Sequence, residues 1–92
     1  MKVLQSSLFA KTVKKLHKPE KALLDDAIKA LLVEPELGDL KTGDLNGVRV
    51  YKFKVNTQQM LLAYRYQKEV LVLMLLAYGS HENFYRDLKK SL

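Results

Sequence analysis

The chain contains no cysteine. Disulfides, thiolate zinc sites and cysteine nucleophiles are therefore excluded, and the composition suits a reducing cytoplasm. Long hydrophobic runs are missing as well, because no apolar stretch approaches the ~20 residues that a membrane helix needs. Charged residues interrupt the apolar positions of the N-terminal segment every few residues, which is not the pattern of a signal peptide. We therefore expect a cytoplasmic protein with no membrane partner.

Sequence motifs of known chemistry are also absent. There is no glycine-rich phosphate loop and no G-x-S-x-G nucleophile turn. The two histidines, His17 and His81, stand far apart in the sequence and do not have the spacing of a metal site. His17 lies in a basic segment and has the character of an ordinary surface residue. We expect neither a metal ion nor a cofactor.

Positive charge is abundant, because the net charge of the 92-residue chain is +6. An apolar content of 48% fits a folded protein, and the length allows one domain over residues 1–92 with a modest core. A positive field on so small a body favours a polyanion such as nucleic acid, or an acidic protein. General solubility is the alternative explanation of the charge.

The longest apolar run has nine residues, Val70 to Tyr78, and ends at Gly79. Its lack of polar interruption predicts a central strand that is covered on much of both faces. Alternating segments predict three more strands, at 2–5, 48–56 and 59–67. The second of these would turn its aromatic residues toward the helices and its lysines toward the opposite face.

Helical periodicity occupies most of the N-terminal third. Apolar residues recur at three- and four-residue steps from Leu8, and Pro19 suits the first turn of a second helix that ends at Val33. The buried stripe of this second helix is predicted to be Leu24, Ile28, Leu31 and Leu32. A short helix is predicted over 81–92. The order β-α-α-β-β-β-α predicts an α+β fold, in which a helical hairpin covers one face of an antiparallel four-stranded sheet.

Two pairs of residues are candidates for chemistry. Lys52 and Lys54 share one strand face, which would be either a phosphate-binding platform or a solvated face that blunts aggregation. His81 and Tyr85 are four residues apart, so they lie on the same side of a helix. Histidine is the side chain most easily poised as a general acid or base near neutral pH, and tyrosine can stack on a base. A capping or surface histidine is the alternative.

Further cations could contact phosphate. Arg65 lies in a strand whose other face is apolar, where it would balance a phosphate charge or pair with an acidic side chain. Cleavage of RNA by an attacking 2′-hydroxyl needs a base, cations at the phosphate and an acid for the leaving oxygen. The composition permits this assignment without singling it out. The remaining candidates for binding RNA phosphates lie on the first and last helices: Lys11, Lys14, Lys15, Lys18, Arg86, Lys89 and Lys90.

The segments LFAKTVKKL, GDLNGVRVYKFKV, LLAYRY and GSHENFY, with the apolar strand between the last two, resemble the RelE/ParE superfamily of bacterial type II toxin–antitoxin systems. The resemblance covers nearly the whole chain. It implies a ribosome-dependent mRNA endonuclease that a cognate antitoxin inhibits by wrapping around it. YKFKV is similar to the RelE strand with two catalytic lysines, here Lys52 and Lys54. GSHENFY is similar to the YafQ-type ending, which implies that His81 and Tyr85 act at the scissile phosphate.

The sequence departs from both patterns. Leu61 stands where RelE-type enzymes have a phosphate-stabilising arginine, and Arg65 is offset from it by four positions. Val55 and Gln59 stand where YafQ-type enzymes have further histidine and acidic residues. ParE-type members of the superfamily lack the nuclease residues and poison DNA gyrase. A gyrase poison, or an inactive toxin fold that only binds its antitoxin, is therefore the alternative to the nuclease.

Overall fold

The computed structural model describes residues 1–91, with the side chains of all but residues 82, 83 and 91. None of the helices in this part of the chain is long and apolar enough to span a membrane. The last residue of the predicted C-terminal helix, at position 92, lies outside the described residues. The elements follow in the order β1 (Lys2–Gln5), α1 (Ser7–Lys14), α2 (Lys18–Val33), β2 (Asp39–Leu40), the 3-10 turn η1 (Gly43–Leu45), β3 (Arg49–Val55), β4 (Gln58–Gln67), β5 (Val72–Ser80) and α3 (His81–Ser91).

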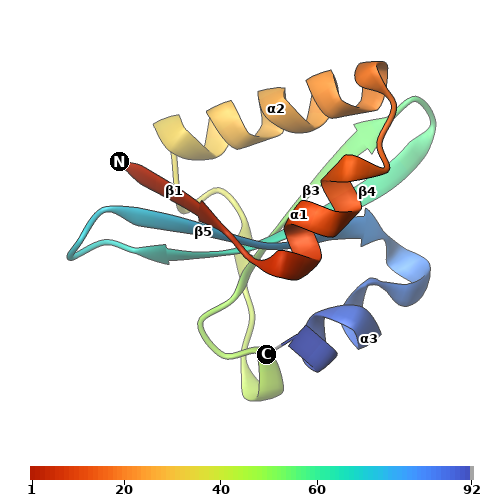
Figure 1. The fold of residues 1–92 in the computed structure, drawn as a ribbon. Coiled ribbons are helices and arrows are strands. Elements are labelled where there is room, and N and C mark those ends of the chain that lie inside the picture. Colours follow the sequence, from red (N-terminus) through yellow and green to blue (C-terminus); the bar gives the residue numbers. More distant parts are fainter. Residues whose placement is uncertain (92) are drawn as a thin grey trace.

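The strands form one sheet in the order β1-β5-β4-β3-β2. The helical hairpin of α1 and α2 lies on one side of this sheet and α3 on the other (Figure 1). The predicted α+β class, with its N-terminal helical hairpin and short C-terminal helix, is confirmed. The element order also agrees, except for one additional short strand.

Two details of the predicted sheet are wrong. The sheet has five strands rather than four, because the two-residue β2 pairs with the start of β3. It is also not wholly antiparallel, because β1 runs parallel to β5. A tight turn would force antiparallel pairing, whereas the long connection through two helices and three strands lets β1 and β5 run in the same direction.

The first helix begins at a side-chain cap. The Ser6 hydroxyl accepts a hydrogen bond from the Phe9 backbone N–H (3.1 Å) and donates one to the Leu76 carbonyl of β5 (2.7 Å). Such a cap satisfies a donor that the first turn of a helix leaves unpaired. The same hydroxyl therefore starts α1 and attaches it to the central strand.

The second helix buries Leu24, Ala27 and Leu31. The prediction that Leu32 belongs to this stripe is wrong, because Leu32 is 37% exposed. Seven residues after Leu24 the helix returns to nearly the same side, whereas eight residues overshoot it by about 80°. Leu31 therefore points to the sheet and Leu32 away from it.

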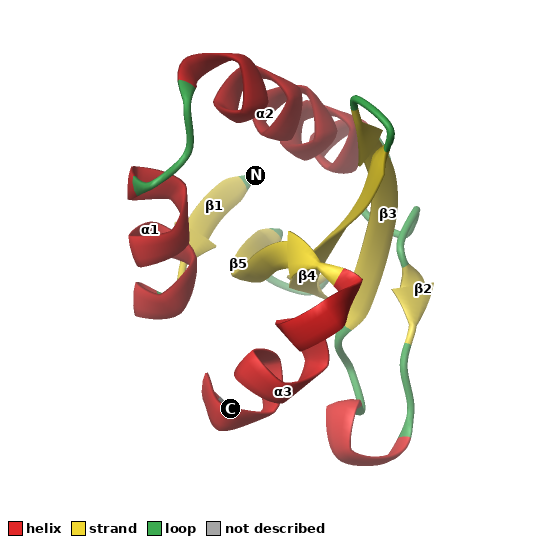
Figure 2. Cartoon of the chain, turned by 90° about the vertical axis from the view of Figure 1, so that its right-hand side faces the viewer, coloured by secondary structure: helices red, strands yellow, loops and turns green. Residues whose placement is uncertain are grey.

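Two apolar clusters lie on opposite faces of the sheet, and Figure 2 shows α2 and α3 on these two sides. The first packs Phe9 of α1 and Leu24 of α2 against inward residues of β3, β4 and β5. The second packs Phe84 and Leu88 of α3 against the other face. The prediction that the apolar strand is central and covered on both faces is thus confirmed.

The apolar strand begins later than its sequence suggested. Val70 and Leu71 are 64% and 53% exposed and belong to the loop between β4 and β5. Further along, the register shifts between Ala63 and Tyr64, so that Ala63 pairs with Ala77 but Tyr64 with Leu75. This bulge adds one residue to β5 and changes which of its side chains share a face.

The loop after α2 is fixed to the sheet by Tyr64. Its buried hydroxyl accepts a hydrogen bond from the Gly38 N–H (2.9 Å) and donates one to the Pro35 carbonyl (2.7 Å). Burial is the main reason why the pKa of Tyr64 lies above its usual value. A Cβ at position 38 would lie 2.8 Å from the Tyr64 ring, so glycine is required there.

Candidate functional site

One end of the sheet gathers the predicted catalytic residues. Lys52 of β3 pairs with Leu61 of β4, and Leu61 pairs with Gly79 of β5. Neighbouring strands are about 4.8 Å apart, so the Lys52 and Gly79 backbones lie about 10 Å from each other. Gly79 is two residues before His81, the first residue of α3. The end of β5 thus brings His81 to the same end of the sheet as the lysines.

The two lysines point to the α3 face of the sheet. Tyr51, Phe53 and Val55 of the same strand pack in the cluster under α1 and α2. Because side chains alternate along a strand, Lys52 and Lys54 project from the opposite face, and both are exposed. The predicted orientation of this strand is confirmed.

His81 and Tyr85 are in contact. Their ring centroids are 5.8 Å apart, with the planes at 75°. Tyr85 in turn meets the edge of Phe84 at 5.1 Å, and Phe84 is buried against the sheet. The half-buried Tyr85 thus packs on Phe84 of the core, while the imidazole of His81 stays exposed to solvent.

Together, the four residues present a basic and aromatic surface at one end of the α3 face. An exposed imidazole can take up or give a proton near neutral pH, and ammonium groups stabilise a crowded phosphate. Two exposed lysines and a histidine next to an aromatic ring therefore suit a phosphodiester substrate.

Leu61 lies between Lys52 and Gly79 and contributes no charge. It is 0% exposed and belongs to the cluster under α3. The place where the resemblance implied an arginine is therefore filled by an apolar side chain that serves the core.

Arg65 is not part of this surface. It is four residues from Leu61 along β4, or about 13 Å toward the other end of the sheet. Its Nη1 donates a hydrogen bond to the Asn46 carbonyl (3.2 Å) and lies 2.7 Å from where a Cβ at Gly47 would be. Arg65 thus holds the loop after η1 against the sheet, and Gly47 leaves the room for it.

The other predicted RNA-binding cations lie on two helices. Lys11, Lys14, Lys15 and Lys18 are all exposed on α1 and the start of α2. On α3, Arg86 lies 3.8 Å from Asp87 and Lys89 lies 3.5 Å from Asp44. The lysines of α1 form no ion pair within the described residues, so they are the more available of the two groups.

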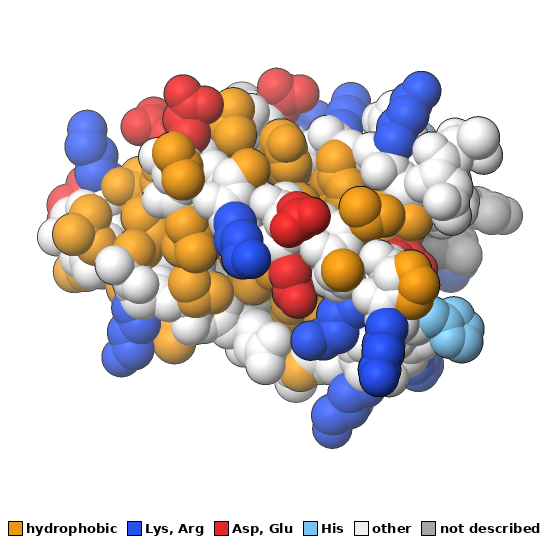
Figure 3. All heavy atoms as spheres, turned by 90° about the horizontal axis from the view of Figure 1, so that it is seen from above, with side chains coloured by type: hydrophobic (Ala, Val, Ile, Leu, Met, Phe, Trp, Pro, Cys, Tyr) orange, Lys and Arg blue, Asp and Glu red, His pale blue; other side chains and the backbone are white. Residues whose placement is uncertain are grey.

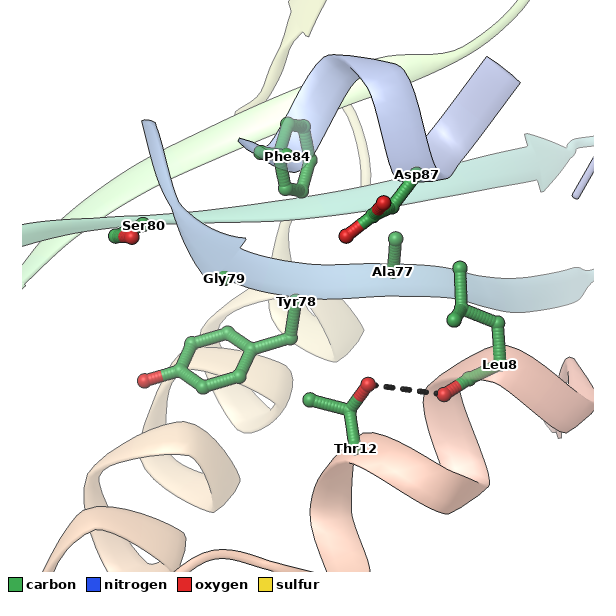
Figure 4. A pocket seen from close by; sticks show the side chains of 8 residues that line it. All are labelled: Leu8, Thr12, Ala77, Tyr78, Gly79, Ser80, Phe84 and Asp87. Atoms are coloured by element: carbon green, nitrogen blue, oxygen red, sulfur yellow. Dashed lines mark hydrogen bonds between the residues drawn. The ribbon is translucent and has the colours of Figure 1, made fainter. Parts of the chain in front are cut away.

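A hollow of about 200 Å³ adjoins the candidate site. Phe84 and Asp87 of α3 face Leu8 and Thr12 of α1 across the end of β5 (Figure 4). Neither Thr12 nor Asp87 was a candidate from the sequence. Asp87 follows Phe84 by three residues and so lies on the same helix face. This spacing is the feature of the sequence that could have indicated Asp87 as a lining residue. The rest of the lining is Ala77, Tyr78, Gly79 and Ser80.

Comparison with known proteins gives the family. The family model described as "ParE-like toxin of type II bacterial toxin-antitoxin system" matches residues 3–89. The chain therefore belongs to the ParE-like toxins of type II bacterial toxin–antitoxin systems. No curated protein matches the sequence.

Solved structures agree on the fold. The intact Escherichia coli RelBE toxin–antitoxin complex is similar with a TM-score of 0.70 at 20% identity, covering 88% of this chain and 96% of that one. A free E. coli RelE toxin with two arginines replaced by alanine is similar with a TM-score of 0.72 at 18% identity, covering 98% of this chain and 90% of that one. A RelBE toxin–antitoxin complex of Mycobacterium tuberculosis is similar with a TM-score of 0.73 at 20% identity, covering 87% of this chain and 96% of that one. The fold is thus RelE-like.

Proposed function

We propose that this toxin is an endonuclease that cleaves mRNA on the ribosome in the cytoplasm, without a metal ion, and that a cognate antitoxin neutralises it. One observation carries the proposal. Lys52 and Lys54, the pair His81 and Tyr85, and the end of β5 share one end of one sheet face. A sequence resemblance alone gave these residues their roles, and their convergence in the fold supports it.

The roles follow from the chemistry of each side chain. Lys52 and Lys54 stabilise the charge on the phosphate or activate the 2′-hydroxyl, and His81 acts as the general acid or base. Tyr85, which is held by Phe84, stacks on a substrate base. In the reaction the 2′-oxygen bonds to phosphorus, the bond to the 5′-oxygen breaks, and the leaving oxygen receives a proton.

The antitoxin partner is supported by the family and by charge. Two of the similar structures are toxin–antitoxin complexes. A net charge of +6 on this chain favours an acidic partner, because complementary charge speeds and orients association.

Primer extension on cellular mRNA after induction of the toxin tests the nuclease. The wild type is expected to produce new ends within translated regions. His81→Ala and the double variant Lys52→Ala/Lys54→Ala are each expected to lower the yield of these ends by about 10²-fold or more. Lys29→Ala, which removes an exposed lysine from α2, is the matched control and is expected to cleave like the wild type. Absence of new ends with the wild type would sink the nuclease.

A second candidate function is poisoning of DNA gyrase. The matching family is ParE-like, and the buried Leu61 provides no arginine for a phosphate. A gyrase poison is expected to accumulate cleaved gyrase–DNA complexes in a supercoiling assay and to be indifferent to His81→Ala. If overexpression causes no growth arrest, both toxic activities fail and a non-toxic binding protein remains.

A further inference from the structure

The end of the molecule opposite to His81 carries exposed apolar side chains. β5 has nine residues, so the loop that precedes it lies about 30 Å from His81. Figure 3 looks down on α2 and shows hydrophobic side chains gathered in its left half, and the β4–β5 hairpin projects to the left in Figure 1 below the level of α2. We define the distal surface as the exposed or half-buried residues Leu37, Leu40, Tyr66, Lys68, Val70 and Leu71.

A hollow of about 270 Å³ lies within the distal surface. The first residue of β3, Arg49, pairs with Tyr64 of β4, and β4 continues for three more residues that β3 does not cover. The hollow lies where this part of β4 has no neighbouring β3 residue. Leu40 and Tyr66 are apolar parts of its wall, and Leu40 is 57% exposed. Lys68 also lines it and forms no ion pair within the described part of the chain, whereas Glu36 and Arg49, which line it as well, pair with each other at 3.5 Å. The hollow therefore offers apolar contact and an available positive charge.

The hairpin tip beside this hollow is strained. Leu71 has a φ of 52°, a backbone conformation that glycine and asparagine adopt more readily than leucine. Its side chain gains no burial in return, because it is 53% exposed. Folding alone would favour a small or polar residue here, and strain of this kind concentrates at binding sites.

We propose that the distal surface is the docking site of the antitoxin, for a segment that combines apolar and acidic side chains. The proposal rests on the function proposed above, which supplies the partner. Apolar residues of the segment would contact Val70, Leu71 and the wall of the hollow, and an acidic residue would pair with Lys68. Charge favours this occupant over a second copy of the chain, because two copies would each carry +6.

The position of the docking site separates two properties of the toxin. Contacts at the hairpin tip would lie about 30 Å from His81. Substitutions there are expected to change neutralisation, while substitutions at the lysines and His81 change toxicity. A variant altered at the distal surface should therefore stay toxic and escape its antitoxin.

The test uses the protein encoded by the reading frame adjacent to the toxin gene as the probe. Its affinity for the wild type is compared by calorimetry with that for Leu71→Asn and for the double variant Leu40→Asn/Leu71→Asn. We expect at least a 10-fold loss for the single variant and a larger loss for the double variant. Leu23→Gln is the matched control, because it removes a leucine of 39% exposure from α2, away from the hairpin. It is expected to bind like the wild type.

Two further measurements exclude trivial results. Leu71→Asn is expected to unfold at the same or a higher urea concentration than the wild type, since asparagine suits the backbone of position 71. It is also expected to arrest growth when expressed without the probe protein. Equal affinity of all variants would overturn the docking site, as would a dimer of the toxin that Leu71→Asn dissociates. If the wild type binds no probe protein or arrests no growth, the proposed function itself fails.

Discussion

Among single residues, Tyr64 is fully buried and makes two hydrogen bonds through its hydroxyl. Its buried hydroxyl joins the buried N–H of Gly38 to the partly buried carbonyl of Pro35. Both partners lose a hydrogen bond when the hydroxyl is removed.

We expect Tyr64→Phe to lower the free energy of unfolding by about 1–3 kcal/mol, because the buried N–H of Gly38 is left unpaired and the partly buried Pro35 carbonyl loses its donor. Urea unfolding followed by circular dichroism measures the loss. Tyr66→Phe is the control, since the half-buried Tyr66 makes no side-chain hydrogen bond within the described residues, and it should change stability by less than about 0.5 kcal/mol. Equal effects of the two substitutions would contradict this role of Tyr64.

Tyr78 makes stability depend on alkaline pH. Burial, and then the hydrogen bond that its hydroxyl donates to Glu20 (2.6 Å), raise the pKa of Tyr78 well above 10. In the unfolded chain this pKa is about 10. Below pH 10 both states keep the proton and the stabilisation is complete. Above pH 10 the unfolded state releases the proton first, so stability falls by up to about 1.4 kcal/mol per pH unit for this group.

Unfolding free energies measured in urea between pH 8 and 11 test this prediction. The pKa of Tyr64 is also raised by burial, so the informative quantity is the difference between the wild type and Tyr78→Phe. We expect that difference to be constant at pH 8 to 9 and to shrink above pH 10. A difference that does not change with pH would show that Tyr78 titrates normally.

At the scale of elements, the cap of α1 links a helix to the sheet. Ser6→Ala is expected to cost about 1–2 kcal/mol, because the helix loses its cap and the Leu76 carbonyl loses its donor. Ser7→Ala changes the next residue, which is exposed, and should have little effect. Thermal unfolding of the two variants distinguishes them. If Ser7→Ala lowers stability as much as Ser6→Ala does, the effect belongs to helix propensity and not to the cap.

Local patterns predicted most elements of this fold. Alternation along 49–55 gave the faces of β3 correctly, and the spacing of His81 and Tyr85 gave their contact, because both depend on the geometry of one element. The parallel pairing of β1 with β5 and the pairing of β2 could not be read from the sequence, because pairing depends on residues far apart in the chain.

The candidate site shows the same division. The sequence pointed to Lys52 and to His81 separately, but the row Lys52–Leu61–Gly79 that brings them together spans three strands. The separation of Arg65 from this row follows from the register of β4, which the resemblance did not supply. Asp87 was missed because a single exposed carboxylate on a basic helix has the pattern of ordinary surface.

At the scale of the whole molecule, the charge of +6 favours binding to a polyanion, and RNA is the polyanion that the proposed nuclease activity requires. The lysines of α1 are exposed and form no ion pair within the described residues. We expect the triple variant Lys11→Ala/Lys14→Ala/Lys15→Ala to bind a single-stranded RNA oligonucleotide more weakly, and to lose up to about two units of the slope of log K against log salt. Fluorescence anisotropy between about 50 and 200 mM salt measures both.

Lys2→Ala is a control at the opposite end of the molecule. It removes an exposed lysine from β1 and should leave the slope within about half a unit of the wild type. A triple variant with the full slope of the wild type would remove α1 from the RNA-binding surface. Ribosome binding would then depend on the cations of β3 and α3.

The parallel pairing of β1 with β5 has a consequence for synthesis of the toxin. Residues 2–5 lie beside residues 72–75, and β5 stands between β1 and β4 in the sheet. A nascent chain therefore cannot join β1 to β4 through β5 until residue 80 has been translated, and contacts so distant in sequence form slowly. His81 also follows β5 directly. The row that places Lys52 beside Gly79 therefore forms only after β5 has been made and has paired with β4.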